Sequence, residues 1–130
     1  FYQQHDIPAS SQMIKLNHLR DIGGYNENTK VEDWDLWLRL TGAGAKLVYI
    51  PDVIVGYRMH DSNLSKNKSL MFDEVFNIVQ SYKDRKGFPY AEYKVYKLYK
   101  IRPAKEKSYL LYFWLRMKYL LLYLAKSMGR

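Results

Sequence analysis

The strongest constraint on the fold is a nearly uninterrupted apolar stretch close to the end of the chain, "YLLYFWLRMKYLLLYLA" at residues 109–125. Its length approaches that of a membrane span, but Arg116 and Lys118 stand near its middle. A lipid-exposed charge at the centre of a membrane helix costs roughly 2.5–3.5 kcal/mol. The stretch is therefore a poor transmembrane segment. A helix so apolar must still be covered by a partner chain, by another part of the protein, or by a lipid interface.

Charge is distributed very unevenly along the chain. Residues 1–65 hold six Lys/Arg and eight Asp/Glu, for a net charge of −2, whereas residues 66–130 hold fifteen and five, for a net charge of +10. Nine of the thirteen tyrosines also fall in the second half, interleaved with lysines in "YAEYKVYKLYK". Basic residues mixed with aromatics suit a nucleic-acid groove, an anionic membrane surface, or the solvated face of ordinary helices.

Length and cysteine content limit the number of domains and the kinds of chemistry that the chain can have. A chain of 130 residues can fill one modest core, so we expect one domain or part of one. The absence of cysteine excludes disulfides and thiolate chemistry, and suits a reducing cytosol. The opening "FYQQHDIPAS" has neither an initiator methionine nor a secretion signal, so we expect a piece of a longer protein.

Periodicity and breakers divide the chain into expected elements. Paired glycines in "DIGGYNEN" predict a tight loop with positive φ, and Gly42 and Gly44 predict the end of a helix. Pro103 is expected to separate the last two helices. The pattern predicts a strand at 9–16 and either two strands or one bent strand at 46–50 and 53–58. It predicts helices at about 32–41, 71–82, 90–101 and 104–127.

The acids in "KVEDWDLWLRL", residues 30–40, admit two interpretations. Acids in a first helical turn face the positive end of the macrodipole, and Asp35 can pair with Arg39 four residues on, so stability alone could explain them. Alternatively, Asp33 is held ionised at a cleft, with a pKa kept low by the helix dipole. Such a carboxylate can act as a general base on a substrate hydroxyl.

The stretch "SSQMIKLNHLRDIGGYNENTKVEDWDLWLRLTGAGAKLVYIPDVIVGYRMHDSNLS" resembles the C-terminal part of the catalytic domain of inverting family 2 glycosyltransferases. The resemblance covers about residues 7–66. It rests on the "GGYNE" loop, on Glu-Asp opening a Trp-rich helix, and on Tyr-Arg-x-His downstream. It implies the GT-A fold, so we expect an α/β class: a partial GT-A fold with few short strands plus helices, followed by a mostly helical tail. The corresponding division is 1–66, the acceptor-side portion, and 67–130, a basic and aromatic helical tail.

The resemblance also implies roles for individual residues. Asp33 corresponds to the catalytic base that deprotonates the acceptor hydroxyl, and Glu32 helps to shape the acceptor site. His60 is similar to a histidine that approaches a divalent metal, Mg or Mn, and the donor diphosphate; a histidine satisfied by a neighbouring group is the alternative. Arg58 would offset diphosphate charge, or be solvated or paired. Trp34 would stack on a sugar, or pack in the core.

The chain departs from the family pattern in one respect. No Asp-x-Asp metal motif precedes the acidic helix, and "DWD" at 33–35 lies inside that helix. We therefore expect most metal ligands to belong to a nucleotide-binding half that is missing here, and the isolated chain to turn over no nucleotide-sugar. Ser10 and Ser11 are expected to line the cleft without an assigned role.

The resemblance implies partners as well. We expect a nucleotide-sugar donor and a glycan or lipid-linked glycan acceptor in cell-surface polysaccharide synthesis, and no nucleic acid. The protein would be cytoplasmic, with peripheral contact of the basic tail to the inner membrane face; packing of the tail on the catalytic domain, or a homodimer, is the alternative. Two rival functions stay open: a non-enzymatic basic module that binds anionic membrane or nucleic acid, and a degenerate glycosyltransferase used as a scaffold.

Overall fold

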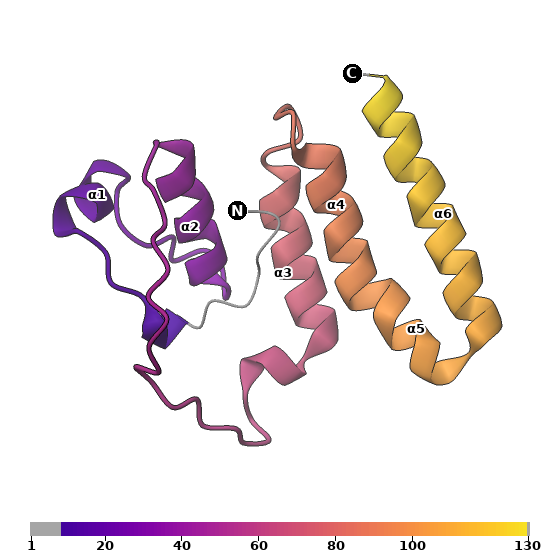
Figure 1. Cartoon of the computed structure of the whole chain (residues 1–130), viewed down its shortest axis with the longest axis horizontal. Coiled ribbons are helices and arrows are strands. Elements are labelled where there is room, and N and C mark those ends of the chain that lie inside the picture. Colours follow the sequence, from indigo (N-terminus) through magenta and orange to yellow (C-terminus); the bar gives the residue numbers. More distant parts are fainter. Residues whose placement is uncertain (1–8, 130) are drawn as a thin grey trace. The chain divides into compact units, whose positions relative to one another are not determined.

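The structure is a computed structural model, and it describes residues 9–129 (Figure 1). Over these residues the chain forms two compact units, which we call unit 1 (residues 9–66) and unit 2 (residues 67–129). Unit 1 contains the helices η1 (Ala9–Ser11), α1 (Leu16–Asp21), α2 (Glu32–Gly42) and η2 (Leu64–Lys66). Unit 2 contains α3 (Lys68–Gln80), α4 (Phe88–Tyr96), η3 (Lys97–Ile101), α5 (Arg102–Lys107) and α6 (Tyr109–Met128).

Helix α2 supplies the core of unit 1. Leu36 is fully buried, and the rest of the buried apolar set comes from the same helix and the residue before it: Val31, Trp37, Leu38 and Leu40. The Trp37 indole N–H donates a hydrogen bond to the side-chain oxygen of Gln12, which ties the segment after η1 to the helix. The sequence prediction of a helix at 32–41 is confirmed.

The expected α/β fold class is wrong, because residues 9–129 contain no strand and no sheet. The expected strand at 9–16 is replaced by η1, an irregular stretch and the first residue of α1. Residues 46–59, which include both other expected strands, lie exposed as an irregular trace, with Val48 84% and Val53 100% accessible. Strand propensity reflects packing and pairing against a neighbour, and the backbone N–H groups of 46–59 make no hydrogen bond in the structure.

Positive φ angles occur where the sequence predicts them. Gly23 and Gly24 have φ of 79° and 78°, and they form the turn that ends α1. Gly44 has φ of 91° two residues after α2 ends. Side chains with a Cβ rarely adopt this left-handed region, so glycine suits both turns.

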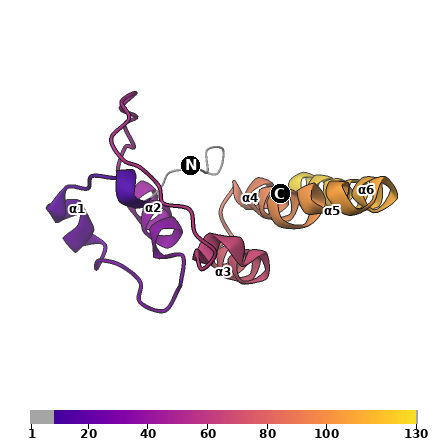
Figure 2. The same cartoon turned by 90° about the horizontal axis from the view of Figure 1, so that it is seen from below.

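Unit 2 is a set of adjacent helices in which α4 packs on both α3 and α6 (Figures 1 and 2). Its apolar core is formed by side chains from α3, α4, η3 and α5: Val75, Ile78, Val79, Phe88, Ala91, Val95, Ile101 and Ala104. Aromatic rings extend this core toward α6. Tyr96 of α4 stacks on Tyr119 of α6, with ring centroids 4.0 Å apart and planes 13° from parallel.

One buried carboxylate also joins the three long helices of unit 2. Glu92 of α4 is 7% accessible. Its carboxylate accepts a hydrogen bond from the Gln80 amide of α3 at 3.0 Å and forms a salt bridge with Lys126 of α6. A buried carboxylate is tolerated when its oxygens are paired in this way.

The predicted break at Pro103 is wrong. The helix runs through the proline from α4 to α5, and the chain turns at Ser108, which has extended φ and ψ of −164° and 127°. Pro103 lacks an N–H to bond the carbonyl four residues back, and the preceding turn, η3, is a π-helix with wider spacing. The Ser108 hydroxyl accepts from the Leu111 N–H and caps α6.

Helix α6 has no fully buried residue, and the side away from α4 carries an exposed apolar stripe. We call this set the α6 stripe; it consists of Leu110, Phe113, Trp114, Met117, Leu121, Leu124 and Met128. Within the described part of the chain, no helix, α6 included, is long and apolar enough to cross a membrane.

Candidate functional site

The candidate site is the first turn of α2, where Asp33 occupies a half-buried position. Its carboxylate oxygen Oδ1 accepts a hydrogen bond of 2.8 Å from the backbone N–H of Trp34. The Trp34 N–H also donates to the Val31 carbonyl at 3.1 Å, so the Asp33 carboxylate shares this donor at the start of the helix. This bond fixes the Asp33 side chain at the positive end of the helix.

The pKa of Asp33 is raised above its ordinary value, chiefly because burial removes water from the carboxylate. The neighbouring charge of Glu32 raises it further, whereas the hydrogen bond from the Trp34 N–H lowers it. The sequence-based expectation of a low pKa is therefore wrong, because the helix dipole was considered without the burial. A raised pKa makes the ionised carboxylate a stronger base.

The other two acids of this turn have different surroundings. Glu32 is exposed. Asp35 is buried, and its Oδ2 lies 2.7 Å from Nε of Arg39, as predicted from their spacing. The Arg39 guanidinium also donates to the carbonyl of Ile22 at 2.8 Å, linking α2 to the end of α1. Asp35 is thus a structural residue, and Asp33 is the half-buried acid of the pair in "DWD".

Of the remaining predicted site residues, only Trp34 contacts Asp33 directly among the residues described, through its backbone N–H. Trp34 is half-buried beside it, whereas Arg58 and His60 lie exposed in the irregular segment. Nδ1 of His60 is 2.9 Å from the Ser62 hydroxyl. No hydrogen bond or ion pair connects Asp33 with Arg58 or His60 over the residues described. Ser10 is exposed and Ser11 half-buried in η1.

The predicted metal role of His60 was compared with the donor set around it. Among residues 9–129, no group of three or more His, Cys, Asp or Glu side chains is arranged to hold a metal ion. The described residues therefore do not by themselves form a divalent-metal site. The metal stays a prediction for His60.

The family of the chain is identified by comparison with known proteins. Residues 4–122 match the family model described as glycosyltransferase like family 2. The chain belongs to this glycosyltransferase-like family. No curated protein and no solved structure matches it. The resemblance seen in the sequence ended near residue 66, whereas the family match continues through α3, α4 and α5 and into α6.

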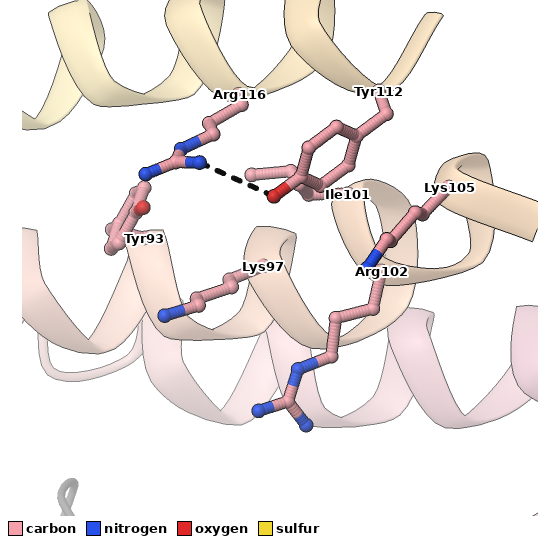
Figure 3. Close-up of a pocket in the computed structure, with 7 residues that line it drawn as sticks. All are labelled: Tyr93, Lys97, Ile101, Arg102, Lys105, Tyr112 and Arg116. Atoms are coloured by element: carbon pink, nitrogen blue, oxygen red, sulfur yellow. Dashed lines mark hydrogen bonds between the residues drawn. The ribbon is translucent and has the colours of Figure 1, made fainter. Parts of the chain in front are cut away.

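This family 2 chain has a second group of polar residues that the sequence did not single out. A pocket in unit 2 is lined by residues of α4, η3, α5 and α6 (Figure 3): Tyr93, Lys97, Ile101, Arg102, Lys105, Tyr112 and Arg116. Residues 97 and 101, and likewise residues 112 and 116, are four positions apart. This spacing indicates that the members of each pair lie on the same face of a helix. The sequence could not show that the two segments face each other.

Proposed function

We propose that this chain supplies the acceptor-side base of a glycosyl transfer from a nucleotide-sugar to an acceptor hydroxyl, with inversion at the sugar. The observation that supports this most directly is Asp33. It is half-buried at the start of α2, held by the Trp34 N–H, and its pKa is raised in a chain that belongs to a glycosyltransferase-like family. These are the properties a general base for an alcohol requires.

In the proposed reaction, an acceptor hydroxyl hydrogen-bonds to the carboxylate of Asp33, which removes the proton as the oxygen attacks the anomeric carbon. A new carbon–oxygen bond forms on the face opposite the leaving group. The bond between the anomeric carbon and the diphosphate breaks, and the electron pair leaves with the nucleoside diphosphate. Attack on the opposite face inverts the configuration. Asp33 holds the proton until solvent or product removes it.

Other predicted residues have supporting roles in this proposal. Exposed Glu32 would contact the acceptor, and half-buried Trp34 would stack its ring on a sugar face. Arg58 would offset the negative charge of the diphosphate. His60 would be one ligand of a divalent metal, Mg or Mn, which would neutralise diphosphate charge if the remaining ligands come from outside the described residues.

We further propose that unit 2 contacts an anionic membrane from the cytoplasmic side, where a lipid-linked glycan acceptor for polysaccharide synthesis would be presented. The α6 stripe is apolar and exposed, and residues 66–130 have a net charge of +10. Apolar helix faces flanked by Lys and Arg bind at lipid interfaces. A homodimer through the same stripe is the alternative partner.

The proposed function is tested with Asp33→Asn in the intact protein that carries this chain. Asparagine keeps the size of the side chain and can still accept the Trp34 N–H, so the helix start is preserved. Loss of the general base should reduce the turnover number by about 10²–10⁴-fold, with acceptor binding little changed. The measurement is acceptor-dependent release of the nucleoside diphosphate.

Two controls accompany this variant. Glu32→Gln changes an exposed neighbouring acid and should reduce turnover much less. The activity of the unaltered protein should rise with pH through a pKa above the ordinary aspartate range, because the base must be ionised, and this limb should vanish in Asp33→Asn. Undiminished turnover by Asp33→Asn would exclude Asp33 as the base and favour a scaffold role.

The raised pKa also gives a stability effect of known sign. Folded Asp33 binds its proton more tightly than the unfolded chain does, so its contribution is complete below the unfolded pKa and is lost as the pH rises through the folded pKa. Asp33→Asn removes this titration. At neutral pH the variant should therefore be at least as stable as the unaltered protein while being less active.

A further inference from the structure

The pocket of unit 2 has the dimensions of a ligand site. Its volume is about 320 Å³, and it is formed by parts of four successive helical elements (Figure 3). Ile101 is buried and contributes the apolar part of the wall. Arg102, Lys105 and Arg116 are exposed, so the polar rim is accessible to solvent. The space exceeds what one water needs by about tenfold.

The charges that surround this pocket are all of one sign. Four of the seven lining residues are cations, namely Lys97, Arg102, Lys105 and Arg116, and none is an acid. In the structure as described, none of the four forms an ion pair. Over residues 9–129, the only side-chain hydrogen bond between lining residues runs from the Arg116 guanidinium to the Tyr112 hydroxyl, at 3.3 Å.

Unneutralised cations around one cavity repel one another, and this repulsion weakens the fold unless an anion is present. Carboxylates are available nearby in sequence, since Glu92 and Glu106 belong to α4 and α5. Glu92 instead pairs with Lys126 and Gln80. The pocket therefore keeps its positive charge while neighbouring acids are used elsewhere or left at the surface.

We propose that this pocket binds a phosphate group carried by a larger molecule. Guanidinium groups match the geometry of phosphate oxygens, lysines add charge, and the Tyr93 and Tyr112 hydroxyls are further donors. The π-helical turn η3 sits between α4 and α5 and places Lys97 and Arg102 at the same opening. π-turns occur frequently at functional sites. The pocket belongs to unit 2, whereas Asp33 belongs to unit 1.

The phosphate could belong to a lipid headgroup or to a soluble phosphate ester, and both present the same oxygens. Arg116 and Tyr112 project from α6, the helix that carries the exposed α6 stripe. A lipid would therefore engage both features, whereas a soluble ester would engage the pocket alone. This difference separates the two sources in the experiment.

The experiment measures binding of two probes to the full 130-residue chain. The first probe is inorganic pyrophosphate, and its binding is measured by titration calorimetry and by amide NMR shifts. The second is a set of phosphatidylcholine vesicles with or without phosphatidic acid, and binding to them is measured by co-sedimentation. The pocket variant is Lys97→Gln/Lys105→Gln. The control, Lys86→Gln/Lys107→Gln, removes the same number of lysines at exposed positions that do not line the pocket.

The pocket variant should weaken binding of at least one probe by about tenfold or more, the effect of losing charge-assisted hydrogen bonds, while the control stays within about twofold. Arg116→Lys, which keeps the charge but loses the planar fork, should also weaken binding. Binding of pyrophosphate without preference for phosphatidic acid vesicles indicates a soluble ester, and preferential binding to phosphatidic acid vesicles indicates a lipid. Equal weakening by both double variants, or no binding of either probe, would overturn the proposal. Far-UV circular dichroism establishes that each variant is folded.

Discussion

Unit 1 and unit 2 are stabilised by different kinds of contacts. Unit 1 depends on one amphipathic helix, α2, and leaves the backbone N–H groups of a long apolar segment at 46–59 without hydrogen bonds. Unit 2 is almost continuously helical, and stacked aromatic rings and the Glu92 contacts connect its helices. The residues proposed for sugar transfer all belong to the less ordered unit. Of these residues, Glu32, Asp33 and Trp34 lie on α2, whereas Arg58 and His60 lie on an irregular segment, where binding residues commonly occur.

The largest expected difference between the units is in amide hydrogen exchange. Amides of residues 46–59 make no hydrogen bond and should exchange almost as fast as an unfolded chain. Amides in the middle of α3 and α4 should be slower by about 10³-fold or more, which corresponds to an opening free energy of roughly 4 kcal/mol. Mass spectrometry of peptides from both regions measures this. Equal protection would mean that 46–59 is paired in solution.

A core substitution in unit 1 should have the next largest effect. Leu36 is fully buried in α2, so Leu36→Ala should lower the free energy of unfolding of unit 1 by about 2–5 kcal/mol. Leu47→Ala makes the same chemical change at an exposed position and should stay within about 0.5 kcal/mol. The two variants are compared by urea unfolding, with the indole NMR signal of Trp37 as the probe of unit 1. Similar losses in both variants would contradict the assignment of the core to α2.

A smaller effect is expected from the carboxylate that joins the helices of unit 2. Glu92→Ala leaves the Gln80 amide and the Lys126 ammonium without their partner and should cost about 1–3 kcal/mol. Part of the loss is offset because Lys126 is 43% exposed and can be hydrated. Exposed Glu106→Ala is the matched control, within about 0.5 kcal/mol. Thermal unfolding by circular dichroism measures the stability of both variants. If Glu92→Ala leaves the stability unchanged, the aromatic stacking is sufficient to hold the helices of unit 2 together.

The helices were largely predictable from the sequence, whereas their interruptions were not. Apolar spacing located α2 and α3, because burial on one face imposes the helical period. The six-residue helix α1 was missed, since a segment so short carries too few repeats to be recognised. The strands at 46–50 and 53–58 were wrongly predicted because β-branched residues show what a segment could pair with, not whether a partner is present. Ser108 rather than Pro103 breaks the last helices, since the π-helical turn before Pro103 accommodates the proline within a continuous helix.

The position of Asp33 in its helix could be predicted from the sequence, but the electrostatics around it could not. The position of Asp33 in the first turn of α2 followed from the sequence, as did the Asp35–Arg39 pair. The direction of the Asp33 pKa did not, because desolvation depends on neighbours that only the fold supplies. Residues of the phosphate pocket lie on two segments joined by the turn at Ser108, so their convergence was also invisible in the sequence.

The close stacking of Tyr96 on Tyr119 has a practical consequence. Two phenol rings held nearly parallel at 4.0 Å have coupled electronic transitions, so unit 2 carries an optical reporter of its own packing. Separation of α4 from α6 would remove this coupling and change the near-ultraviolet dichroism of tyrosine without any attached label. Docking of a ligand between these helices could thus be followed in real time from the native chromophores.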